Sequence, residues 1–265
     1  MKLALVFASI LVAAVSAGSV PRFGFPENDY SRTRIINGKP ARRGEAPYIV
    51  SLLAGQNGAH FCGGSIIAEN WVLTAAHCLM DDIYVRAGLH ARNDVSNTQT
   101  IAVAKTFGHE KYGGSVGPYD IALLKLSGDF TFTDTIQAIE MPADSTQEKG
   151  QCTLFGWGKD TPNGGLPNVL MTVTTDLVPY ADCKNLLPGG SPIHSTNICS
   201  GSKNSGISAC NGDSGGPLVS EINGKLKQVG VVSWGYIPCG QQNYPSVYTH
   251  TGSHLEWMSN IMAKN

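Results

Sequence analysis

A serine enclosed by glycines in the C-terminal third of the chain constrains the fold most. The motif Gly-Asp-Ser-Gly-Gly occupies residues 212–216. Glycine permits tight turns and close approach of a substrate carbonyl. A serine hydroxyl, however, is a poor nucleophile until a neighbouring base takes its proton. If Ser214 is reactive, the fold must bring a base to it from elsewhere in the chain; otherwise the motif is only a polar turn.

Two upstream motifs supply such a base and a carboxylate to orient it. Thr-Ala-Ala-His-Cys at residues 74–78 carries His77, and Asp-Ile-Ala-Leu-Leu at residues 120–124 carries Asp120. Imidazole titrates near neutrality and suits both general-base and general-acid roles. A carboxylate on the other ring nitrogen fixes the tautomer. The three motifs together favour a catalytic triad over the alternatives, in which Ser214 lies in a polar turn and Asp120 is only a turn aspartate at the edge of a strand.

Short apolar runs between turn residues indicate an all-β chain. The sequence contains 31 Gly and 14 Pro, and its β-branched or alternating runs are brief. We expect strands at residues 48–52, 61–67, 71–74, 83–89, 100–107, 121–126, 151–156, 169–177, 217–220, 228–234 and 246–249. Two groups of about six strands suit two packed six-stranded antiparallel β-barrels. Residues 254–263 instead show helical spacing behind Ser253 as a possible N-cap, which predicts a C-terminal helix.

The N-terminus is typical of a secretory signal peptide. A lysine at position 2 precedes an apolar run to residue 15, and small residues follow up to residue 17. An uncleaved anchor is the alternative, but the run is short for a bilayer. We therefore expect a signal peptide at 1–17 and a soluble, secreted, extracellular protein. The formal net charge of −1 gives no reason to expect nucleic acid or a membrane surface as partner.

The three motifs, in the order His, Asp, Ser, resemble those of chymotrypsin-like serine proteases of the trypsin fold. The resemblance covers essentially all of residues 35–265. It implies two barrels joined near residues 135–150 with the cleft between them, and a monomeric serine endopeptidase without a cofactor. The implied partners are protein or peptide substrates, protein inhibitors and a trypsin-like activating protease. The implied role is digestive, as in gut enzymes of animals, including insects.

The resemblance also assigns roles around Ser214. The backbone N–H groups of Gly212 and Ser214 would form the oxyanion hole. A second group of residues would bind the substrate: Ser208, Asn211, Ser233, Trp234, Gly235 and Ser246. Trp234 has core packing as an alternative role. Ser208 stands at the pocket base, where trypsin-like members carry Asp, and Ser246 stands where many relatives have Gly. We therefore expect a chymotrypsin-like preference for large apolar or aromatic residues in a pocket shallower than usual.

Activation by proteolysis is a further implication. Cleavage after Arg34 would release a propeptide of residues 18–34 and free the α-ammonium of Ile35. That group would pair with the Asp213 carboxylate and order the pocket wall. The alternative is that residues 32–34 form only an exposed basic turn.

The seven cysteines, in a secreted chain, should form disulfides. The resemblance implies the pairs Cys62–Cys78, Cys183–Cys199 and Cys210–Cys239. Cys152 is left over, because its usual partner would fall at Ser220. It is either a buried, inert thiol or half of an intermolecular disulfide.

Two further expectations concern metals and the rival function. Calcium-binding relatives place a carboxylate where this chain has Leu89 and His90, so we expect no metal. The rival is a binding or lectin-like protein on a protease scaffold, with little or no proteolysis. Enzyme-lectins of blood-feeding flies look similar, but no sugar-site motif is evident. The histidines other than His77 receive no role.

Overall fold

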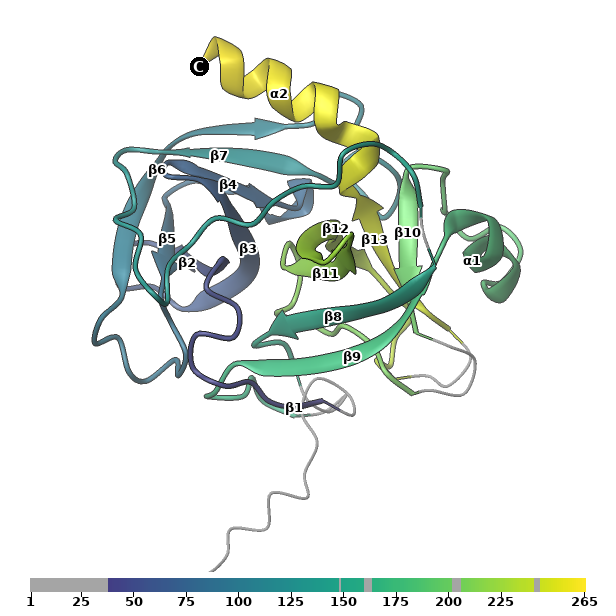
Figure 1. The fold of residues 1–265 in the computed structure, drawn as a ribbon, viewed down its shortest axis with the longest axis horizontal. Helices are drawn as coiled ribbons and strands as arrows, with labels where there is room; N and C mark the ends of the chain where they lie inside the picture. Colours follow the sequence, from purple (N-terminus) through teal and green to yellow (C-terminus); the bar gives the residue numbers. More distant parts are fainter. Residues whose placement is uncertain (1–37, 148, 160–163, 202–205, 241–243) are drawn as a thin grey trace, which may run out of the picture. The chain divides into compact units, whose positions relative to one another are not determined.

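A computed structural model describes residues 38–265 except 148, 160–163, 202–205 and 241–243. Its first half is a closed barrel with the strand order β2-β3-β4-β7-β6-β5 (Figure 1). The strands are β2 (Ile49–Ala54), β3 (His60–Ala68), β4 (Trp71–Thr74), β5 (Ile83–Ala87), β6 (Gln99–Gly108) and β7 (Ala122–Leu126). All its ladders are antiparallel.

The second half closes in the same way. The sheet order is β1-β9-β10-β13-β12-β11-β8, and a further β9–β8 pairing closes a six-stranded barrel with β1 outside it. The strands are β1 (Lys39–Pro40), β8 (Gly150–Gly156), β9 (Met171–Val178), β10 (Asn197–Ser200), β11 (Pro217–Ile222), β12 (Lys225–Trp234) and β13 (Ser246–His250). The predicted all-β fold of two six-stranded antiparallel barrels is confirmed.

The C-terminal helix is also confirmed, but its start differs from the prediction. Helix α2 (Leu255–Lys264) follows the 3-10 helix η2 (Thr251–His254), and its N-cap residue is His254. Ser253 is therefore not the cap, and its hydroxyl bonds to His250 Nδ1 at 2.8 Å. Met258 of α2 is buried within the core of the first barrel, so the apolar stripe is packing surface. Among the described residues no helix is long and apolar enough to cross a membrane.

Two short helices were not expected from the sequence. The 3-10 helix η1 (Ala76–Cys78) carries His77, and α1 (Tyr180–Leu186) precedes β10. Each is too short to show a helical apolar period. Both are held by disulfides, η1 by Cys62–Cys78 and α1 by Cys183–Cys199.

Buried polar contacts hold the barrels together. Ser65 Oγ on β3 donates to Gln228 Oε1 on β12 at 2.5 Å, and both side chains are fully buried. The Ile139 N–H donates to Ile66 O, and the Gln228 N–H donates to Glu140 O. The connecting segment 127–149 is thus bonded to both barrels. Because buried polar groups without partners are costly, these pairs favour one docking geometry.

The cysteines are arranged as the resemblance implies. The structure contains the disulfides Cys62–Cys78, Cys183–Cys199 and Cys210–Cys239. Cys152 is a free thiol on β8, 1% exposed, directly opposite Ser220 on β11. Burial raises the pKa of the Cys152 thiol to about 12, so the reactive thiolate is suppressed. The structure therefore favours the buried thiol over an intermolecular disulfide.

We predict that a thiol reagent finds no reactive cysteine in the native protein and one after denaturation without reductant. The Ser220→Cys variant should then lose even that thiol, because directly opposed residues of antiparallel strands lie within disulfide range. The new bond should raise the unfolding free energy by about 2–4 kcal/mol. Ser220→Ala is the control and should keep one thiol. A disulfide-linked dimer of the unmodified chain on a non-reducing gel would contradict the prediction.

Candidate active site

His77 and Asp120 meet at one edge of the first barrel. His77 lies on η1 just after β4, and Asp120 lies just before β7. The His77 Nδ1–H group faces Asp120 Oδ2 at 2.7 Å, and the His77 backbone N–H donates to Asp120 Oδ1 at 2.9 Å. The preceding residue, Tyr119, has a positive φ of 63°, an uncommon backbone conformation for a side chain of its size. The two bonds fix the imidazole's orientation relative to the carboxylate.

The Asp120 carboxylate also receives a bond from the second barrel. Ser233 Oγ on β12 donates to Asp120 Oδ2 at 2.6 Å, and Thr249 Oγ1 on β13 donates to the Asp120 carbonyl at 2.8 Å. Asp120 is only 3% exposed. A buried carboxylate is tolerated when hydrogen bonds compensate its lost hydration. Its environment is therefore complete only when both barrels are in place.

Ser214 lies on the loop between β10 and β11 and is held against the first barrel. The Gly63 N–H on β3 donates to Ser214 O at 2.8 Å. Gly215 has a φ of 78°, and a Cβ there would lie 2.2 Å from Thr74 Oγ1. The serine loop thus packs against the end of β4, immediately before η1. No direct hydrogen bond joins His77 to Ser214 in the described structure; in many enzymes without substrate such bonds are long and tighten on binding.

Two backbone donors beside Ser214 have no acceptor. Within the described part of the chain, neither the Gly212 N–H nor the Ser214 N–H donates to another residue. The Asn211 carbonyl accepts from the Lys159 N–H at 2.8 Å, which directs the N–H of the same peptide, that of Gly212, to the opposite side. Gly212 has a φ of 102°, in the region that favours glycine. The segment therefore offers two N–H groups to an anion.

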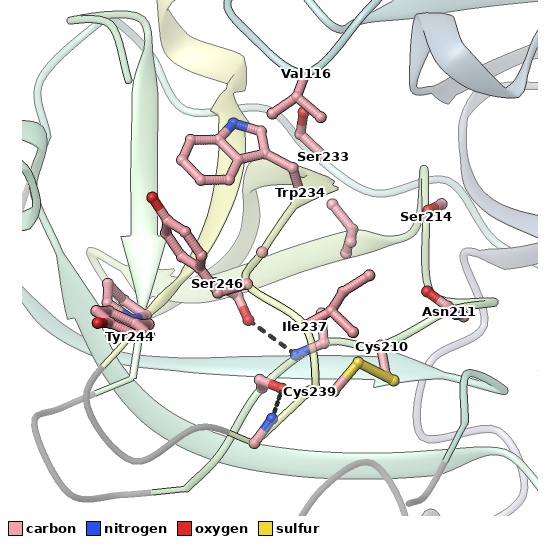
Figure 2. A pocket seen from close by; sticks show the side chains of 17 residues that line it. Val116, Cys210, Asn211, Ser214, Ser233, Trp234, Ile237, Cys239, Tyr244 and Ser246 are labelled. Atoms are coloured by element: carbon pink, nitrogen blue, oxygen red, sulfur yellow. Dashed lines mark hydrogen bonds between the residues drawn. A yellow bond between two sulfur atoms is a disulfide. The ribbon is translucent and has the colours of Figure 1, made fainter. Parts of the chain in front are cut away.

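A cavity of about 250 Å³ opens next to Ser214 (Figure 2). It is lined by every residue expected to bind substrate: Ser208, Asn211, Ser233, Trp234, Gly235 and Ser246. Ser208 Oγ accepts from the Gly240 N–H at 2.7 Å, and Ser246 Oγ accepts from the Ala209 N–H at 3.0 Å. No Asp, Glu, Lys or Arg is among the described residues that line the cavity.

Several lining residues were missed by the sequence analysis. Tyr236 and Tyr244 pack together with ring centroids 4.8 Å apart, and Val116 and Ile237 are 57% and 77% exposed. Tyr236 directly follows Gly235, so its place could have been inferred from that neighbour. Val116 belongs to the other barrel, and no local pattern marks it.

Asp213, which precedes Ser214 in the same loop, has a buried side chain without a cationic partner among the described residues. It is 1% exposed, and its carboxylate accepts from the N–H groups of Gly158 and Cys210 at 2.8 and 2.9 Å. A Cβ at Gly156 or Gly158 would lie 2.0 or 2.2 Å from a carboxylate oxygen. Burial raises the pKa of Asp213 to about 7, although the two bonds oppose the shift. Arg34 and Ile35 lie outside the described residues.

His60 was given no role from the sequence, yet it reaches the same loop. Its Nε2–H faces the Gly212 carbonyl oxygen at 2.9 Å, and its Nδ1 lies 2.8 Å from Ser51 Oγ. Burial lowers the pKa of His60 to about 4, although the bond to the Gly212 carbonyl opposes the shift; the charge of Arg92 makes a smaller contribution in the same direction as burial, so His60 is neutral near pH 7. A neutral ring with Nε2–H as donor leaves Nδ1 to accept from the Ser51 hydroxyl.

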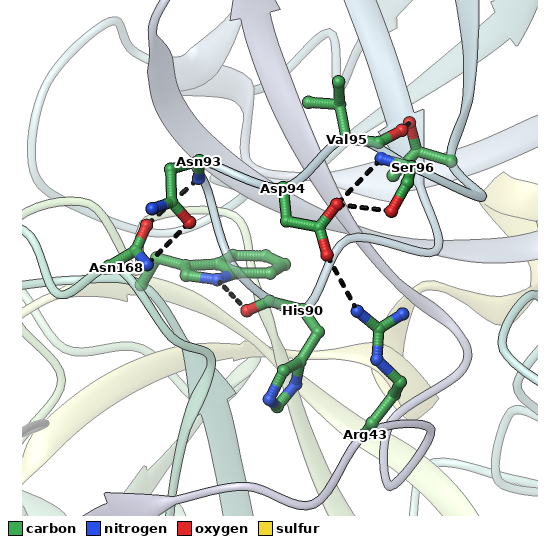
Figure 3. Close-up of polar contacts among 9 residues, drawn as sticks. Arg43, His90, Asn93, Asp94, Val95, Ser96 and Asn168 are labelled. Carbon is green, nitrogen blue, oxygen red and sulfur yellow. Dashed lines mark hydrogen bonds and ion pairs between the residues drawn. The ribbon is translucent and has the colours of Figure 1, made fainter.

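Hydrogen bonds to other protein groups fix the loop from Leu89 to Thr98 (Figure 3). Arg43 Nη2 donates to Asp94 Oδ2 at 3.2 Å, and the Ser96 N–H donates to Asp94 Oδ1 at 3.0 Å.

Among the described residues, one group of potential metal ligands lies close enough together to bind an ion: Cys62, His77 and Cys78. Its two cysteines, however, form a disulfide with each other. That group is therefore no metal site.

The sequence is similar to known proteins along most of its length. Residues 35–258 match the family model described as Trypsin. The chain is 44% identical over 272 residues to Lectizyme of Glossina austeni, covering 97% of this chain and 96% of that one. It is 38% identical over 244 residues to Trypsin I-P1 of Gallus gallus, covering 91% and 94%. It is 37% identical over 233 residues to Kallikrein-7 of Homo sapiens, covering 88% of each chain.

We predict that Asp213 makes the intact chain less stable as pH rises. Its folded-state pKa of about 7 exceeds the ordinary aspartate value of 3.8, so the folded state holds the proton more tightly. The unfolding free energy should fall as pH rises from 4 to 8, by at most about 4 kcal/mol. Urea unfolding at pH 5 and pH 8 measures it.

The Asp213→Asn variant should lose this dependence, whereas Asp81→Asn, at an exposed carboxylate, should keep it. Equal pH dependence in the unmodified chain and Asp213→Asn would show that Asp213 carries no such penalty.

Proposed function

The chain belongs to the trypsin family and is a serine endopeptidase, and on that premise we propose that His77, Asp120 and Ser214 are its catalytic triad. One observation carries the proposal: the Asp120 carboxylate, which accepts bonds from both barrels, binds the His77 imidazole on η1, and the Ser214 loop packs against the end of β4 immediately before η1. A carboxylate in this position holds the tautomer that leaves Nε2 free to accept a proton.

The reaction follows from these groups. His77 Nε2 takes the proton of Ser214 Oγ as the oxygen attacks the peptide carbonyl, and the same nitrogen later protonates the leaving amine. Negative charge develops on the carbonyl oxygen. The unpartnered N–H groups of Gly212 and Ser214 would receive it, and in related sites one such donor contributes about 3 kcal/mol. The peptide would lie along residues 233–235, pairing through its backbone.

We predict that Ser214→Ala, His77→Ala and Asp120→Asn each lower kcat for peptide hydrolysis by about 10⁴-fold or more. Each variant should unfold at nearly the temperature of the unmodified chain. A fluorophosphonate should label Ser214 in the activated chain but not in Ser214→Ala.

The alternative function, a binding or lectin-like protein on this scaffold, predicts no labelling of the folded, activated chain. Retention of more than about a hundredth of the turnover by Ser214→Ala would sink the triad proposal.

For substrate choice, we propose a preference for Phe, Tyr and Leu before the cleaved bond. Some of the relatives are named trypsins, so the argument rests on the pocket rather than on the family. The Ser208 and Ser246 hydroxyls are neutral and already accept backbone N–H bonds. A lysine or arginine side chain would be buried among lining groups that include no carboxylate. An unpaired buried cation costs about 3–5 kcal/mol.

We predict that paired substrates differing only in Phe or Arg before the cleaved bond differ at least about 100-fold in kcat/KM, in favour of Phe. The Ser246→Gly variant should cleave a Trp substrate better, relative to a Phe substrate, than the unmodified chain does. The change removes the serine hydroxymethyl group, with which a Trp side chain would overfill the pocket at a cost of about 1–3 kcal/mol. Faster cleavage of the Arg substrate would refute the preference and point to a carboxylate that reaches the pocket from elsewhere.

We further propose that the chain is secreted as an inactive precursor, activated by a trypsin-like cut after Arg34, and serves in digestion. The support is the buried Asp213 carboxylate, whose two bonds come from N–H groups and not from a cation. The new α-ammonium of Ile35 would supply that cation. The Asp213-dependent loss of stability between pH 5 and pH 8 should then disappear in the cut chain.

A further inference from the structure

Arg92 belongs to the loop between β5 and β6 in the first barrel, yet its guanidinium binds a loop of the second barrel. Arg92 Nε donates to Pro167 O and Nη2 donates to Leu166 O, both at 2.9 Å. The side chain is half-buried, and among the described residues no carboxylate pairs with it. Two parallel bonds to successive carbonyls use the planar fork of arginine, which lysine lacks.

Backbone and side-chain contacts reinforce this connection. The Arg92 N–H donates to Asn168 O at 2.7 Å, and Asn93 and Asn168 exchange bonds of 3.0 and 2.8 Å (Figure 3). The Leu170 N–H donates to His90 O at 2.8 Å. The segment from Leu166 to Leu170 is therefore held by the first barrel.

Leu166 in turn packs on the proposed oxyanion hole. A Cβ at Gly212 would lie 2.8 Å from Leu166 Cδ2 and 3.1 Å from Gly158 Cα. The leucine therefore lies against the face of Gly212 from which a side chain would project. His60 holds the carbonyl of the same glycine, and the charge of Arg92 contributes to keeping His60 neutral.

We propose that Arg92 is a positioning residue for the oxyanion hole, acting through Leu166 on the Gly212 peptide. This inference rests on the proposed function. Arg92 touches neither Ser214 nor the cavity lining, so its effect appears in the transition state, when the carbonyl oxygen becomes charged. Substrate binding along residues 233–235 does not involve it.

The test compares Arg92→Met and Arg92→Lys with Arg43→Met in the activated chain. Arg43 is the matched control, since it pairs with Asp94 of the same loop but does not contact residues 166–168. Kinetics on one peptide amide give kcat and KM. Inhibition by a peptide aldehyde, which forms an oxyanion-like adduct on the serine, is compared with inhibition by the matching peptide alcohol, which does not.

We expect Arg92→Met to lower kcat about 10-fold and to change KM less than about twofold. The expected loss in kcat is smaller than the roughly 10²–10³-fold loss that follows deletion of an oxyanion donor, because both donors are still present. Affinity for the aldehyde should fall by the same factor and affinity for the alcohol should not change. Arg92→Lys should resemble Arg92→Met, because it keeps the charge but cannot bind both carbonyls. Arg43→Met should match the unmodified chain in all four quantities.

The inference is overturned if Arg92→Met matches Arg43→Met, or if aldehyde and alcohol weaken together. If Arg92→Met does not fold, Arg92→Lys decides by the same criteria. An unmodified activated chain that neither cleaves peptides nor reacts with a fluorophosphonate would instead refute the proposed function, and this inference with it. An active unmodified chain with an unaffected Arg92→Met refutes the inference alone.

Discussion

The burial of the Asp120 carboxylate is the constraint on which the rest of the site depends. A carboxyl group that is 3% exposed needs several hydrogen bonds to replace its lost hydration. Here they come from His77 in the first barrel and Ser233 in the second. The group that orients the proposed base is thus stable only when the barrels are docked. The geometry of the proposed base and its carboxylate therefore depends on the correct docking of the two barrels.

The serine loop shows a second balance between stability and function. Gly156 and Gly158 allow the Asp213 carboxylate of this loop to approach them closely, at separations that a side chain at either glycine would prevent. The resulting burial disfavours the charge of Asp213, and its raised pKa expresses that cost. A cation delivered by proteolysis would relieve it. The same close packing places Gly212 against Leu166, a residue that is absent from the lining of the cavity beside Ser214.

Much of the fold could be predicted from the sequence because short alternating runs between turn residues indicate strands directly. The proposed triad could be predicted because each of its members lies in a local motif of its own. Helix η1 and helix α1 could not be predicted, since helices of three and seven residues are too short to show an apolar period. Ser253 was a reasonable N-cap by residue type, but its hydroxyl bonds to His250 instead. Val116 and Arg92 were missed because their partners lie far away in sequence.

By itself, the sequence determined the strand-rich architecture, the chain order of His77, Asp120 and Ser214, and the neutral residue at Ser208, because these depend on residue type and near neighbours. Only the tertiary structure decided which donors satisfy Asp120, that Cys152 is buried opposite Ser220, and that Arg92 reaches the loop beside Gly212. Those outcomes depend on how two closed barrels dock. Docking is governed by long-range packing and by the need to pair buried polar groups, and neither leaves a local pattern in the chain.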